Sequence, residues 1–216
     1  MIDIAKLIEK ELLRQQEEGK KRERSGKFSP SKMGRCLRYQ IWSRMNEPET
    51  NLPNIDALKR FAVGNVIHTY VQNLFDPKCV EVLIETEDIK GYIDICLVDE
   101  VQDIKSVSDW AFKYIKTKDF DVNKEKPDNC MQTALYADVK NKPKASLFFI
   151  NTKSLGSVQC EVDLDKWIPI VRKELETLRG YWSKKELPPA LPRCYNGKEC
   201  SYCSFLQKCN QLEGKI

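Results

Sequence analysis

The sequence has a single histidine and no long apolar run. No stretch approaches the roughly 18 apolar residues that a membrane span requires. The charged, amphipathic N-terminus, residues 1–15, lacks the apolar centre of a signal peptide. We therefore expect no membrane partner and an intracellular, cytoplasmic location. The pattern G-x-x-x-x-G-K-[ST] is also missing, which excludes a built-in NTPase motor of that type.

Length and composition favour one domain. The 216 residues, of which 41% are hydrophobic, suffice to bury one sizeable core. The net charge of +4 is compatible with a nucleic-acid partner but does not indicate one by itself. Nine cysteines are many for a reducing compartment, where thiols serve metals or chemistry more often than disulfides. The positions of the cysteines therefore matter.

Hydrophobic periodicity predicts helices and strands in mixed order, which is typical of an α+β or mixed α/β fold. Helices are expected over 3–18, from an N-cap at Ser31 to Met45, from Asp56 to Phe75, over 128–140 and over 165–183. Strands are expected over 79–86, 91–98, 101–107, 145–152 and 157–164. A polar loop is expected over 116–127, and the Pro- and Cys-rich tail 187–211 is expected to be loop with one short helix.

Charged side chains inside two of these strands need a partner. If residues 99–100 form the turn, Val98 pairs with Val101, and Asp94 lies opposite Lys105 with Asp103 on the same face. A carboxylate in such apolar surroundings is costly unless it is neutralised. A cross-strand ion pair would do this, and so would a divalent cation. Two carboxylates around a hard cation, with an ammonium nearby, are suited to phosphodiester hydrolysis.

The pattern Gly91-x-x-Asp94 followed by Asp103-Ile104-Lys105 resembles the core motif of the RecB-like branch of the PD-(D/E)xK nuclease superfamily. The resemblance implies a restriction-endonuclease-like fold, with a central mixed sheet flanked by helices. It also implies that the two aspartates and the Ile104 carbonyl bind Mg²⁺ or Mn²⁺, while Lys105 assists the attacking water.

Two further motifs fall in the order that this branch shows. Upstream, Gly64-x-x-x-His68 is similar to the helical histidine motif, so His68 is implied as a further ligand of the metal. Its imidazole suits Mn²⁺ better than Mg²⁺. Downstream, Gln132-x-x-x-Tyr136 looks like the QxxxY motif, on one face of a helix. There Gln132 would help to hold metal or phosphate and Tyr136 would contact DNA. A core histidine and an ordinary helix pair are the structural alternatives.

Four cysteines complete the resemblance. One N-terminal and three C-terminal residues, Cys36 and Cys200-x-x-Cys203-x5-Cys209, match the split pattern that holds a 4Fe-4S cluster in this branch. A structural zinc site is the alternative, because C-x-x-C is common to both kinds of centre. Cys194 is a nearby spare thiol and an alternative ligand. The centre would join residues 28–60 and 188–216 into one lobe beside a nuclease core over 61–187, within a single domain.

These motifs are similar to those of CRISPR-associated RecB-like exonucleases, their viral relatives and the AddB nuclease domain. The resemblance implies a DNA nuclease with exonuclease activity on single strands and some endonuclease activity. DNA is then the partner, and a helicase or CRISPR adaptation proteins would work beside it. The alternatives are a non-catalytic DNA-binding or adaptor module and a zinc-stabilised interaction protein. Three lysines, Lys113, Lys116 and Lys118, are candidate DNA contacts, unless they form a solvated helix surface.

Overall fold

The chain folds around one five-stranded sheet, in a computed structural model that describes residues 2–21, 25–191 and 198–212. The strands follow one another across the sheet in chain order. Neighbours are antiparallel except β3 and β4, which run parallel because a helical segment connects them. The strands are β1 (Val80–Glu85), β2 (Lys90–Cys96), β3 (Glu100–Val107), β4 (Lys144–Asn151) and β5 (Ser157–Glu161).

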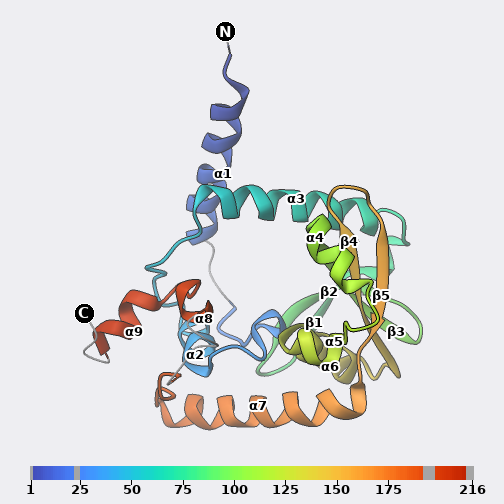
Figure 1. Ribbon diagram of the computed structural model, residues 1–216. Helices are drawn as coiled ribbons and strands as arrows, with labels where there is room; N and C mark the ends of the chain where they lie inside the picture. The colour runs from blue at the N-terminus through green and yellow to red at the C-terminus, as the bar shows by residue number, and fades with distance from the viewer. Residues whose placement is uncertain (1, 22–24, 192–197, 213–216) are drawn as a thin grey trace.

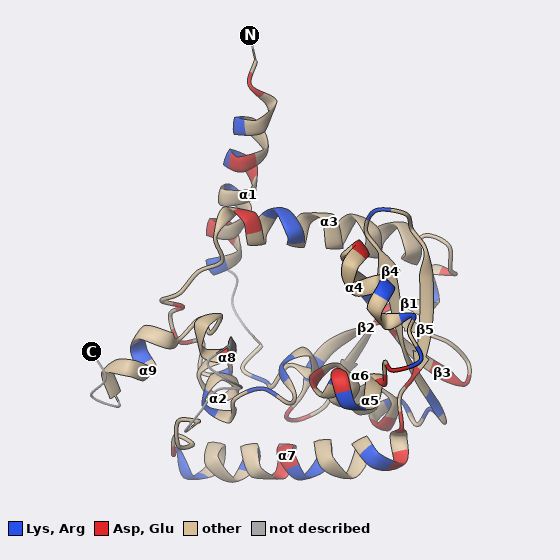
Figure 2. Ribbon diagram, in the orientation of Figure 1, with Lys and Arg blue, Asp and Glu red and all other residues tan. Residues whose placement is uncertain are grey.

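Helices cover both faces of the sheet, which confirms the expected mixed α/β class. Helix α3 (Ile55–Gln72) lies along one face, while α6 (Pro127–Lys140) and α7 (Leu164–Lys184) pack against the other (Figure 1). The remaining helices are α1 (Ile4–Lys20), α2 (Leu37–Arg44), α4 (Asp109–Ile115), α5 (Val122–Glu125), α8 (Lys198–Ser201) and α9 (Leu206–Leu212), with 3-10 helices η1 (Pro30–Lys32) and η2 (Pro77–Cys79). Figure 2 shows charges of both signs interspersed along α1 and α7.

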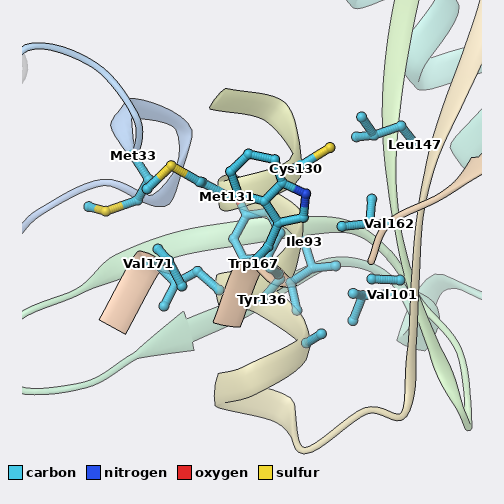
Figure 3. Close-up of a cluster of buried hydrophobic side chains, with 14 of the residues drawn as sticks. Met33, Ile93, Val101, Cys130, Met131, Tyr136, Leu147, Val162, Trp167 and Val171 are labelled. Carbon is cyan, nitrogen blue, oxygen red and sulfur yellow. The ribbon is translucent and has the colours of Figure 1, made fainter. Parts of the chain in front are cut away.

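Two apolar clusters bury both faces of the central strand β3. The smaller one packs Ile67 and Val71 of α3 against Ile104. The larger one lies on the other side, where Val101 of β3 meets residues of α6 and α7, including Trp167 (Figure 3). Because apolar material surrounds β3, a charged side chain within it has to be compensated inside the protein.

The helix predicted from Ser31 to Met45 is interrupted, and that expectation was wrong at its start. The structure has the short η1, a turn, and then α2, which begins after Cys36. Gly34 accounts for the break, because its φ of +78° is not helical. A Cβ at Gly34 would also lie 3.0 Å from the Cα of Asp128, so this turn approaches α6 closely.

Two other segments differ in detail from the expectations. The polar loop predicted over 116–127 contains the single turn of α5, capped by the Asp121 side chain. The tail contains two short helices in its described residues, α8 and α9, where one was expected. Helix α1 forms as predicted but projects from the body, so that Leu12 is its one buried residue among those described. No described helix has the length and apolar character that crossing a membrane requires.

The segment 39–51, around α2, packs against residues 204–205 near the C-terminal end of the described chain. Phe205 is fully buried, with ring centroids 5.5 Å from those of both Tyr39 and Trp42. The backbone amides of Thr50 and Asn51 both donate to the Ser204 carbonyl, at 2.8 and 2.9 Å. This contact brings the cysteine-bearing segments together on the left of Figure 1. We call it the cysteine lobe, residues 28–60 with the described residues after 188.

Candidate active site

The hairpin of β2 and β3 has a register two residues away from the expected one. Cys96 pairs with Val101, where the prediction paired Val98 with Val101. The reason is the turn, since the Leu97 amide donates to the Glu100 carbonyl at 2.8 Å and closes a four-residue loop. Asp-Glu is a poor two-residue turn. A shift of two residues leaves every side chain on its predicted face.

This register places Asp94 opposite Asp103, not opposite Lys105. The β2–β3 ladder ends just before that position. There the Ile104 amide donates to Asp94 Oδ2 at 2.7 Å, so a side-chain carboxylate replaces the strand carbonyl that would otherwise accept this bond. The strands therefore separate around Asp94, and the carboxylate is held by the backbone of the neighbouring strand.

Asp103 is only 2% exposed and has two different neighbours. Its Oδ1 accepts from Gln132 Nε2 on α6 at 2.8 Å. Its Oδ2 lies 2.6 Å from Lys105 Nζ as an ion pair, although no hydrogen bond of acceptable geometry reaches that buried oxygen. Lys105 Nζ also donates to Gln132 Oε1 at 3.3 Å. The three charges thus converge as predicted, and Gln132 joins them.

His68 approaches the same group from α3. Its Nδ1 lies 3.7 Å from Asp94 Oδ2. Gly64, one turn earlier, explains how the helix comes so close, because a Cβ there would lie 3.0 Å from Ser106 Oγ of β3. The G-x-x-x-H spacing therefore has a steric basis. Gly64 allows α3 to lie close to β3, and this brings the His68 side chain near Asp94.

Tyr136 lies one helical turn beyond Gln132, whose Nε2 donates to the Tyr136 hydroxyl at 3.3 Å. The two side chains share one face of α6, as predicted. Tyr136 is 3% exposed, however, and belongs to the larger apolar cluster. Its ring therefore has a packing role in the described structure, and its contact with DNA stays a prediction.

If the chain cleaves DNA as the resemblance implies, the rate is expected to decrease as the pH falls through about 6. Burial, reinforced by Asp94 and opposed by Lys105, raises the pKa of Asp103 from 3.8 to about 6. Burial lowers the pKa of His68, but the Asp94 carboxylate outweighs this and the pKa is raised overall. Both groups therefore become protonated, and unable to bind a cation, as the solution turns acidic. The measurement is the pH profile of kcat/KM, with circular dichroism as the control for folding. A profile that is flat down to pH 5 would contradict it.

Replacing Gln132 with alanine is expected to lower kcat/KM for the DNA cleavage that the resemblance implies by about ten- to a hundredfold. This is the usual effect of losing a residue that orients a metal ligand. Gln132 bridges Asp103 and Lys105, so its loss frees both side chains. The matched control is Gln159→Ala, which removes an amide that donates to Glu100 at 2.8 Å on β5. Cleavage kinetics of both variants check this, and equal effects would contradict it.

The donors at this site are suited to a hard divalent cation. Carboxylate and carbonyl oxygens are the ligands that Mg²⁺ and Mn²⁺ prefer, and one or two carboxylates with substrate and water commonly suffice for Mg²⁺. Asp103 Oδ2 is a buried oxygen to which no described residue donates a hydrogen bond of acceptable geometry. Across residues 2–21, 25–191 and 198–212, no three His, Cys, Asp or Glu side chains already stand in a metal-binding arrangement.

Three of the predicted cluster cysteines lie close to one another, and no metal-binding arrangement is formed within the part of the chain that the structure describes. The thiols of Cys36, Cys203 and Cys209 are free and near enough to act on one another electrostatically. Burial is the main reason that the pKa values of Cys36 and Cys203 are raised. Cys200 is disulfide-bonded in this structure, and Cys194 lies outside the described residues.

Polar groups surround these sulfurs. Arg38 Nη1 donates to Cys209 Sγ at 3.4 Å, and the Phe205 amide donates to Cys203 Sγ at 3.4 Å. The Cys36 amide donates to Glu199 Oε1 at 2.7 Å. Hydrogen bonds to sulfur favour thiolates and tune iron-sulfur centres. The donor set therefore suits a cluster or zinc once Cys200 is reduced.

The lysines predicted to contact DNA are all exposed, and the structure gives two of them local partners. Lys113 is paired with Asp109 at 2.8 Å. The Lys116 ammonium lies 5.7 Å from the centroid of the Phe112 ring, within the usual cation–π range. Lys118 follows α4 in an exposed turn. Their role in DNA binding stays a prediction.

Sequence reasoning missed a cavity beside Asp94. A pocket of about 550 Å³ adjoins the site, between η1, α2, β2 and α6. Lys27, Lys32, Lys90 and Tyr92 are among its lining residues. They come from separate segments with no common spacing, so no pattern in the sequence could have grouped them. The single sequence signal was the run of serines and lysines over 25–32.

Fold and site together define a mixed α/β architecture similar to a nuclease fold. No family model and no curated protein matches the chain. Among solved structures, the chain is similar to SSO0001, with a TM-score of 0.57 and 16% identity over 100% of this chain and 98% of that one. It is also similar to an alkaline exonuclease, LHK-Exo, from Laribacter hongkongensis, with a TM-score of 0.52 and 16% identity over 74% and 89% of the two chains. The complex of LHK-Exo with dAMP matches equally, with a TM-score of 0.52 and 15% identity over the same shares.

Proposed function

We propose that this chain is a metal-dependent DNA nuclease of the RecB-like type. The observation that carries the proposal is the convergence of Asp94, Asp103 and Lys105 where β2 and β3 separate, with Gln132 holding the last two. A buried charge group of this kind is costly to maintain for stability alone. The similarity of the fold to an alkaline exonuclease supports the same conclusion.

Asp94, Asp103, His68 and the Ile104 carbonyl would hold Mg²⁺ or Mn²⁺ in this proposal. The bound cation would supply charge stabilisation at the phosphoryl group and lower the pKa of water. The side chains and backbone of the protein position the water and the metal ligands. Lys105 orients the attacking water and offsets negative charge, Gln132 fixes Asp103, and the Ile104 amide fixes Asp94.

The proposed substrate is single-stranded DNA, cleaved as an exonuclease with some endonuclease activity. A separate helicase or CRISPR adaptation proteins would supply such strands. Cys36, Cys200, Cys203 and Cys209 would hold a 4Fe-4S cluster that staples the cysteine lobe without taking part in hydrolysis. The contact between Tyr39, Trp42 and Phe205 supports a structural role, because it already joins the same segments.

The test begins with anaerobic purification and a visible spectrum. The protein is then incubated with end-labelled single-stranded DNA, with Mn²⁺, Mg²⁺ or EDTA. We expect a brown protein that degrades DNA only with a metal ion. DNA binding without turnover in any metal would overturn the nuclease proposal in favour of a DNA-binding adaptor. A colourless preparation containing stoichiometric zinc would overturn the cluster but leave the nuclease standing.

A further inference from the structure

We propose that the pocket between η1, β2 and α6 is a nucleotide-binding subsite, which holds the single strand beside the scissile phosphodiester. This inference rests on the proposed nuclease function and deepens it. The pocket is defined by Lys27, Ser29, Ser31, Lys32, Lys90 and Tyr92, and we call it the Ser/Lys pocket. Asp94 and Gln132 also line it, so it opens directly onto the candidate active site.

The charge of the pocket is suited to phosphate. Three lysines line it, and Asp94 is the one acidic side chain among the described lining residues. Lys27 and Lys90 each lie 3.0 Å from Glu85, so that one carboxylate holds two ammonium groups in place. Two ammonium groups and one carboxylate leave a net charge of about +1 for Lys27, Lys90 and Glu85 together. Phosphate contacts of this kind supply most of the affinity of sequence-independent binding.

Hydroxyl groups stand beside these cations. Ser29 Oγ and Ser31 Oγ lie 2.9 Å apart on either side of Pro30, and both line the pocket. Gln40 and Ser43, on the wall formed by α2, are 2% and 6% exposed. Among the described residues, Gln40 Oε1 has no hydrogen-bond partner, and Ser43 Oγ, beside Tyr39, has none of acceptable geometry. Buried polar atoms are normally satisfied, so these two oxygens are consistent with a polar ligand.

Tyr92 gives the pocket a surface for a base. It is 52% exposed, although it lies in the middle of β2, and it lines the pocket on the same strand face as Asp94. Exposed aromatic rings beside a cationic groove are the stacking platforms of single-strand binding proteins. The volume of about 550 Å³ falls within the usual range of small-ligand sites, which admits nucleotides but not a duplex.

The wall of the pocket is rigidly placed. A Cβ on Gly91 would lie 2.8 Å from Pro30 Cδ, so η1 sits directly on β2. The Phe28 amide donates to the Asp88 carbonyl at 2.7 Å, and the Lys90 amide donates to the Phe28 carbonyl at 3.0 Å. These bonds extend the sheet by one bridge. Ser31 and Lys32 of η1, and Ser29 just before it, are therefore held in place beside β2.

The test measures equilibrium binding of a fluorescent oligothymidylate to the full chain, by anisotropy in EDTA, over a range of salt concentrations. Tyr92→Ala is expected to weaken binding by about tenfold, and Tyr92→Phe to keep it, because stacking needs the ring and not the hydroxyl. Lys32→Ala and Lys90→Ala are each expected to reduce the slope of log affinity against log salt by about one. Lys124→Ala is the control, since its ammonium is on α5 and its side chain is 79% exposed.

Cleavage by the unaltered protein is measured in parallel, so that two failures can be distinguished. If the unaltered protein binds and cleaves DNA and the pocket variants bind DNA with the same affinity, the subsite proposal is wrong and the nuclease proposal stands. If the unaltered protein neither binds nor cleaves DNA, both fail together. A single 5-iodouracil in the oligonucleotide provides a second measurement that needs no variant. Photo-crosslinking at Tyr92 supports the subsite, and crosslinking confined to α4 overturns it.

Discussion

Replacing Lys105 with alanine is expected to reduce DNA cleavage by at least about a hundredfold, and by up to about ten thousandfold if the ammonium orients the water throughout the reaction. Lys105 Nζ lies 2.6 Å from Asp103 and donates to Gln132 at 3.3 Å, so it stands within the charge group itself. Single-turnover cleavage of end-labelled DNA in saturating Mn²⁺ measures the effect on the chemical step.

The variant should still fold. Removing one partner of a buried ion pair is usually costly, because the other charge remains buried alone. The pKa of Asp103 is already raised to about 6, however, so its carboxyl can take up a proton near neutral pH when Lys105 is gone. Thermal unfolding of the variant checks this. Lys124→Ala is again the surface control, and cleavage by Lys105→Ala at the rate of the unaltered protein would place the activity elsewhere.

Replacing Cys36 with serine is expected to remove the visible absorbance near ~400 nm and to lower Tm by about 10–20 °C. A link between Cys36 and the C-terminal segment closes a very long loop, since Cys36 and its contact Glu199 are 163 residues apart. Crosslinks that close loops of about 100 residues stabilise by up to about 5 kcal/mol, and each kcal/mol shifts Tm by about 2–4 °C at this size.

Cys160→Ser is the matched control for that variant. Cys160 is a partly buried free thiol on β5, packed against the large apolar cluster, and nothing in the resemblance makes it a ligand. The Cys160→Ser variant should keep the full visible absorbance and metal content of the unaltered protein. Anaerobic absorption spectra and iron analysis distinguish the two variants. Full colour in Cys36→Ser would exclude Cys36 from the ligand set.

The convergence of the three charged side chains was predictable because strand alternation is insensitive to a register error of two residues. The sequence predicted that Asp94, Asp103 and Lys105 share a face, and they do, although the turn was placed incorrectly. The G-x-x-x-H and Q-x-x-x-Y spacings were informative for the same reason, since i and i+4 share a helix face. Local periodicity determines which side chains share a face of a helix or strand. Packing of the helices on the sheet then brings those faces together.

The interrupted helix and the pocket were not predictable in this way. The break at Gly34 depends on a positive φ and on the close approach of α6, neither of which is visible in a periodic pattern. The pocket depends on η1 resting on Gly91, a contact between segments about 60 residues apart in the chain, as for Lys27 and Thr86 with their separation of 59. Only tertiary packing sets such distances.

The contact of Phe205 with Tyr39 and Trp42 also affects how the protein folds during its synthesis. Phe205 fills the space between Tyr39 and Trp42, so α2 cannot complete its packing until the ribosome has released residue 205. Contacts of such large sequence separation form late and slow the overall folding rate. During synthesis the sheet can thus assemble while Trp42 stays uncovered, which leaves time for a chaperone to bind the exposed side chains of α2 before Phe205 covers them.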